Sequence, residues 1–109
     1  GFEFGHNGSY WVATANGGLT DATSATAINT NPPFAVCRMR GDSSTEIRLD
    51  GSSIKTGDAG TNGISYMATG VSWYASNCEV LIGEVMLFDQ DMSGPDLSGL
   101  ESYLGRWIP

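Results

Sequence analysis

An alternation of apolar and polar residues runs through Thr45-Glu46-Ile47-Arg48-Leu49-Asp50-Gly51-Ser52-Ser53-Ile54-Lys55-Thr56. Ile47 and Leu49 alternate with charged residues, so their side chains share one face of a strand while the charged side chains share the other. The pair Asp50-Gly51 follows directly, and it suits a tight turn whose residues need positive φ. We therefore predict a β-hairpin over residues 45–56.

Strand patterns occur on both sides of this hairpin, where aromatic and β-branched residues are bounded by Gly, Asn and Pro. The predicted strands lie at residues 9–15, 34–40, 64–68 and 71–75. Within residues 34–40 the alternation places Arg38 and Arg40 on one face and Cys37 on the other. Residues 78–88 are almost continuously apolar, which is typical of a central strand covered on both faces.

Near the end of the chain, the spacing of the apolar residues changes from that of a strand to that of a helix. Leu97, Leu100, Leu104 and Trp107 follow one another at spacings of three and four residues, which predicts one apolar stripe on a helix. Ser93 and Asp96 resemble a capping box, and Pro95 falls in the first turn. Gly99 and Gly105 each cost about 1 kcal/mol relative to Ala, so we expect docking to hold this helix in place.

Composition and charge limit the classes of protein to which this chain can belong. The 109 residues allow a single domain, residues 1–109, and are rich in Gly, Ser, Thr and Asn, with 16% charged residues. This favours an all-β domain in an extracellular or particle-surface setting. Lys plus Arg is 5 against 12 for Asp plus Glu, too few cations for a nucleic-acid binder. No apolar run approaches the roughly 20 residues that span a bilayer.

The two cysteines, Cys37 and Cys78, form no Cys-x-x-Cys pair, and His6 is the sole histidine. A zinc site needs about four nitrogen or sulfur ligands, so this set is insufficient by itself. Both thiols fall in apolar strand patterns. Two interpretations stay open, a pair of buried free thiols or a disulfide between Cys37 and Cys78.

Candidate binding residues are of two kinds. Asp89 and Asp91 flank Gln90, which makes them the best local candidates for calcium, and the alternative is a solvated loop. Trp11, Trp73 and Tyr74 have side chains that stack on sugar rings, and the alternative is core packing. Apart from possible calcium, no cofactor is expected.

No catalytic residue is predicted. A glycoside hydrolase needs two carboxylates facing each other across a cleft, whereas Glu79 and Glu84 differ by an odd number and would point to opposite faces of a strand. Glu84 stands in an apolar segment, and we expect it to be a structural acceptor; Arg106 is one candidate for its partner, and the sequence leaves the partner open. The chain is therefore predicted not to be an enzyme.

Three pieces of the chain together resemble the C-terminal half of a laminin-G-like domain of the concanavalin A-like lectin/glucanase superfamily. They are the strand Phe34–Arg40, the hairpin Glu46–Ile54, and Gly83–Phe88 followed by Met92-Ser93 and Leu100–Ile108. The resemblance covers residues 34–109, and residues 1–33 match it loosely. It implies a jelly-roll sandwich of two antiparallel sheets that serves as a carbohydrate-binding or adhesive module, in secreted proteins or in phage particles.

A complete member of that family has many more strands than are predicted here. A partial sandwich would expose an apolar sheet face and unpaired edges. We therefore expect an upstream segment of the same polypeptide, or other subunits, to complete the sandwich. The function hypothesis is a non-enzymatic structural or adhesive module of an extracellular or virion-surface assembly that contacts glycans. The alternative is an autonomous carbohydrate-binding domain of a secreted protein.

Overall fold

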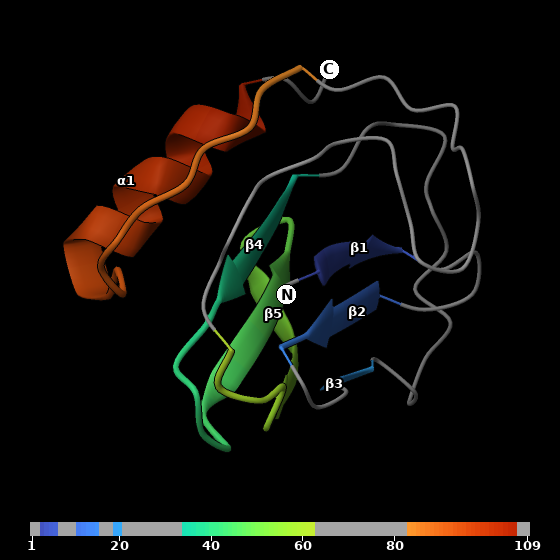
Figure 1. The fold of residues 1–109 in the computed structure, drawn as a ribbon. Coiled ribbons are helices and arrows are strands. Elements are labelled where there is room, and N and C mark those ends of the chain that lie inside the picture. Colours follow the sequence, from blue (N-terminus) through green and yellow to red (C-terminus); the bar gives the residue numbers. More distant parts are fainter. Residues whose placement is uncertain (1–2, 7–10, 16–18, 21–33, 63–82, 107–109) are drawn as a thin grey trace.

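The structure, a computed structural model, describes residues 3–6, 11–15, 19–20, 34–62 and 83–106. Within these ranges the chain forms two three-stranded antiparallel sheets and a helix (Figure 1). In order, the elements are β1 (Glu3–His6), β2 (Trp11–Thr14), β3 (Leu19–Thr20), β4 (Ala35–Arg38), β5 (Thr45–Leu49), β6 (Ser52–Gly57) and α1 (Gly94–Gly105). The prediction of an antiparallel β protein with a C-terminal helix is confirmed at this level.

The predicted hairpin is formed by β5 and β6, and its turn is Asp50-Gly51. Asp50 has φ 50° and Gly51 has φ 83°, the left-handed values that the Asp-Gly pair indicates. The turn is also tied to the start of β4, because the Asp50 amide donates to the Phe34 carbonyl at 3.1 Å. A bulge at Ile47/Arg48 shifts the register of β6 against β5.

The core lies where the two sheets meet. Ile47 and Ala13 are completely buried together with Ala59, which follows β6. Partly buried apolar side chains pack around them: Phe4, Trp11, Cys37, Met39 and Ile54. The Ala15 amide donates to the Ala59 carbonyl at 2.5 Å, so the end of β2 is joined directly to the segment after β6.

The opposite face of the β4–β5–β6 sheet, called the outer face below, is charged. Arg38 and Glu46 are paired across β4 and β5, and Arg48 follows on the same side. Helix α1 and residues 83–93 lie over this face (Figure 1), where Leu97 is the buried side chain of the helix. The second sheet is thus apolar toward the first sheet and charged toward the helix.

The prediction of a central strand at residues 78–88 is wrong for its described part. Gly83–Phe88 lies outside any strand of the described chain, and Val85, Leu87 and Phe88 are 47%, 58% and 46% exposed. The outer face offers charged side chains, so an apolar segment finds little to bury against there. Residues 78–82 and the strands predicted at 64–68 and 71–75 lie outside the described residues.

Helix α1 begins and ends close to the predicted limits, with Ser93 as N-cap and Pro95 in the first turn. The prediction of a capping box is wrong, because within the described residues the Ser93 side chain makes no capping hydrogen bond. Gly94, directly after the cap, has φ 55° and diverts the backbone away from the helical path that such a box requires.

Candidate functional site

Charged side chains on the outer face hold the segment before α1. Arg38 pairs with Glu46 at 2.9 Å and with Asp91 at 3.0 Å, while Arg40 pairs with the other oxygen of Asp91 at 2.9 Å. Both carboxylate oxygens of Asp91 therefore accept from guanidinium groups. These contacts fix residues 89–92 against the end of β4.

A second group of contacts holds the helix itself. Arg48 Nε lies 2.6 Å from Glu101 Oε1 of α1, and Arg48 Nη1 lies 3.4 Å from Glu46. Arg48 Nη2 also donates to the Gly51 carbonyl at 2.7 Å, which ties the hairpin turn to the same cluster. We call Arg38, Arg40, Glu46, Arg48, Asp91 and Glu101 the charged layer.

Two carboxyl groups of the charged layer, Glu46 and Asp91, have pKa values below their ordinary range. Burial acts to raise the pKa of Glu46, but hydrogen bonds from Ser53 and Arg38 and the nearby charge of Arg48 outweigh it, so the pKa is lowered. Burial likewise acts to raise the pKa of Asp91, and the two arginines that contact it lower the pKa overall. Both carboxylates are held in the charged form by their partners.

The candidate partnership of Glu84 and Arg106 is confirmed. Arg106 Nη2 lies 3.2 Å from Glu84 Oε2, and the Tyr103 hydroxyl donates to Glu84 Oε1 at 2.9 Å. The Arg106 guanidinium also lies over the Tyr103 ring, 3.4 Å from its centre. Glu84 thus joins the segment that precedes α1 to the last turn of the helix.

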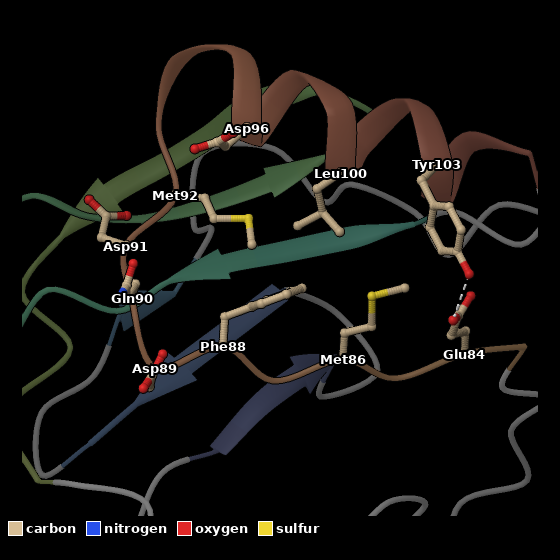
Figure 2. Close-up of a pocket in the computed structure, with 10 residues that line it drawn as sticks. All are labelled: Glu84, Met86, Phe88, Asp89, Gln90, Asp91, Met92, Asp96, Leu100 and Tyr103. Atoms are coloured by element: carbon tan, nitrogen blue, oxygen red, sulfur yellow. Dashed lines mark hydrogen bonds between the residues drawn. The ribbon is translucent and has the colours of Figure 1, made fainter.

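An open groove of about 650 Å³ lies between residues 84–92 and α1 (Figure 2). Its apolar lining comes from both sides, and Figure 2 shows these side chains turned toward one another across the groove. They are Met86, Phe88, Met92, Leu100 and Tyr103. Polar residues line the rest: Glu84, Asp89, Gln90, Asp91 and Asp96.

The four carboxylates of the groove differ in their partners. Glu84 and Asp91 are engaged by arginines, as described above. Asp89 and Asp96 are exposed, and neither forms an ion pair with any other described residue. The groove therefore presents an apolar floor beside two uncompensated negative charges.

The calcium hypothesis for Asp89 and Asp91 is not favoured by this geometry. A cation at Asp91 would have to displace Arg38 and Arg40 from both carboxylate oxygens. Among the described residues, no three His, Cys, Asp or Glu side chains gather in a way that would hold a metal ion. Asp89 instead contributes to the groove.

The other predicted site residues are distributed as follows. Trp11 is half-buried and packs against the core, with its ring centroid 5.7 Å from that of Phe4, which fits the core-packing interpretation. Trp73 and Tyr74 lie outside the described residues. Among the described residues Cys37 is a free thiol, and Cys78 lies outside them, so both interpretations of the cysteines stay open. Burial raises the pKa of Cys37 to about 12.

Sequence reasoning did not identify the groove. The sequence places Met86 and Phe88 in a predicted central strand and Leu100 in the apolar stripe of a predicted helix. A signal was present, because Glu84, Met86 and Phe88 stand two residues apart and share one side of an extended segment. The same spacing does not reveal that α1 lies opposite them.

Comparisons with protein-family models, with curated proteins and with solved structures gave no match. In the part of the chain that the structure describes, no helix has the length and apolar character of a bilayer-spanning segment. Function is therefore inferred from the groove, the exposed apolar side chains beside it and the charged layer beneath.

Proposed function

We propose that the protein is a non-enzymatic structural or adhesive module of a larger assembly, extracellular or on a virion surface, and that a partner covers the face formed by residues 84–92 and α1. One observation carries this proposal. Val85, Leu87 and Phe88 are 47%, 58% and 46% exposed. Phe88 lines the groove, and Val85 and Leu87 alternate along the same segment with the lining residues Met86 and Phe88.

Scattered apolar residues are normal on a protein surface, but a contiguous exposed patch marks an interaction site. Burying a Val, Leu or Phe side chain stabilises by about 1.5–3 kcal/mol. A partner that covers these side chains would gain much of that free energy. The internal ion pairs support the same function, because they hold this apolar surface in one arrangement before any partner arrives.

The resemblance to laminin-G-like domains supports a structural or adhesive role. A jelly-roll sandwich would be completed by strands from an upstream segment or from other subunits. Sheet edges favour such additions, because an edge strand carries backbone groups that a further strand can pair with. In this arrangement the assembled sandwich, rather than a catalytic residue, performs the function.

The test is whether the isolated chain exposes an apolar surface while it is folded. Nile red suits this purpose because it is uncharged and the protein has a net charge of −7. We expect bound, fluorescent dye, and a large loss of signal in a Val85→Ser/Leu87→Ser variant with an unchanged unfolding midpoint. Thr56→Ser/Thr61→Ser, two exposed positions outside the groove, is the matched control. A cooperatively folded monomer that binds no dye would contradict the proposal.

Glycan contact is the second candidate, and the composition of the groove favours it. Phe88 offers an aromatic ring beside Asp89 and Gln90, and sugar-binding sites combine such a ring with amide and carboxylate oxygens. A glycan array with and without calcium tests this. Capture of one glycan class by the isolated chain would make the protein an autonomous carbohydrate-binding domain.

A further inference from the structure

We infer that the groove between residues 84–92 and α1 binds a cationic, apolar peptide segment of a partner protein. An apolar side chain of that segment enters the groove, and a Lys or Arg beside it meets Asp89 and Asp96. This inference rests on the proposed function and specifies the chemistry of the partner.

The floor of the groove is adapted to an apolar side chain of variable shape. Met86 and Met92 contribute flexible thioethers, while Phe88 and Leu100 face each other from the two sides (Figure 2). Methionine-lined surfaces accept different apolar side chains because the unbranched side chain repacks readily. The groove has a volume of about 650 Å³ and is open to solvent, so it can receive side chains of a segment that lies along the surface.

Charge complementarity selects a cationic partner. All four arginines of the chain are engaged by carboxylates inside the structure: Arg38, Arg40, Arg48 and Arg106. None of them therefore offsets the negative charges of Asp89 and Asp96 at the rim. A chain of net charge −7 also attracts cationic segments over a longer range and repels anionic ones.

A second copy of this chain fits the groove poorly. A symmetric contact would bring Asp89 and Asp96 of one copy close to the same residues of the other, and like charges in an interface are costly. The four arginines that could relieve this repulsion are already paired within each copy, and Lys55 does not line the groove. The occupant is therefore a segment of different composition.

The experiment measures the affinity of the full chain for a fluorescein-labelled peptide that carries adjacent Leu residues flanked by Lys. One comparison peptide has Glu in place of Lys, and another has Ser in place of Leu. We expect the Leu/Lys peptide to bind tightest, with both replacements weakening binding about tenfold or more. Added salt should weaken binding of the Leu/Lys peptide, because the rim charges are exposed.

Variants of the protein locate the contact. Asp89→Asn/Asp96→Asn should weaken binding of the Leu/Lys peptide about fivefold, and Phe88→Ser about tenfold. Asp42→Asn/Asp58→Asn changes the net charge by the same amount at exposed positions that do not line the groove, and it should leave the affinity unchanged. An equal loss in both double variants would show nonspecific charge attraction and overturn the inference.

The outcomes separate this inference from the proposed function. If Nile red binds the chain but the Leu/Lys peptide binds no better than the Glu peptide, the partner chemistry is wrong and the assembly role stands. Formation of a dimer that the Phe88→Ser change abolishes would instead identify a second copy as the occupant. The inference would also be overturned if the groove captured a glycan and no peptide competed with that glycan for binding.

Discussion

At the scale of single residues, backbone conformation decides which glycines are needed for stability. Gly51 and Gly94 have φ 83° and 55°, values that residues with a Cβ adopt at a cost, whereas Gly99 lies inside α1. A Cβ added at Gly94 or at Gly99 would meet no heavy atom within 4 Å. The two positions therefore separate the effect of backbone conformation from that of packing.

Gly99→Ala is expected to raise the free energy of unfolding by about 1 kcal/mol, because Ala is the better helix former. Gly94→Ala should lower it by about 1–2 kcal/mol, because its φ is left-handed. Urea unfolding followed by circular dichroism measures both changes. Equal effects of the two substitutions would contradict the backbone explanation.

Cys37 provides a second test at this scale. Since burial raises the pKa of its thiol to about 12, very little thiolate exists near neutral pH. In a Cys78→Ser variant, we expect the native thiol to react with a disulfide reagent at least about tenfold more slowly than the unfolded chain. Similar rates in buffer and in urea would show that Cys37 is accessible.

At the scale of elements, ion pairs hold α1 and residues 83–93 over the sheet. The Arg48 and Glu101 side chains are 17% and 11% exposed, whereas Arg106 and Glu84 are 43% and 28% exposed. The less exposed pair is less screened by water, so it should contribute more to docking.

A double-mutant cycle tests this difference. For Arg48→Gln and Glu101→Gln we expect a coupling free energy of about 1 kcal/mol in unfolding. The same cycle with Arg106→Gln and Glu84→Gln serves as the control, and it should give about 0.5 kcal/mol or less. Equal coupling in the two cycles would show that burial of the charged layer adds nothing to helix docking.

At the scale of the whole molecule, the charged layer connects stability to pH. The pKa values of Glu46 and Asp91 are lower in the folded protein than their ordinary values. Hydrogen bonds from Ser53 and Arg38 stabilise charged Glu46, and those from Arg40 and Arg38 stabilise charged Asp91. The unfolded chain therefore binds more protons in acid than the folded one. This stabilisation is complete above the ordinary pKa of each group and is lost as the pH falls below it.

We expect the melting temperature to fall as the pH drops below about 4.5, with α1 among the elements released. An Asp91→Asn variant should be less stable near neutral pH and should lose less stability on acidification. Thermal unfolding monitored across this pH range measures both effects. The same acid dependence in Asp91→Asn and in the unsubstituted chain would contradict this role of Asp91.

Local patterns in the sequence were sufficient for part of this structure. The hairpin follows from the alternation around Ile47 and the Asp50-Gly51 turn, and α1 follows from its leucine spacing with Ser93 and Pro95 at the start. In each case the residues that define the element are neighbours in the chain. Alternation also predicts that Arg38 and Cys37 lie on opposite faces of their strand, and the core contains Cys37 as expected.

The groove and the charged layer depended on the tertiary structure. Asp91 meets Arg38, and Glu101 meets Arg48, across more than fifty residues of sequence, with nothing in either local pattern to indicate the partner. The apolar run at residues 83–88 resembles a buried strand in sequence, because hydrophobicity alone does not tell which surface lies opposite. That surface is charged, so the run stays at the surface and, with α1, forms the groove. Local periodicity determines elements, whereas long-range charge pairing and packing decide what those elements expose.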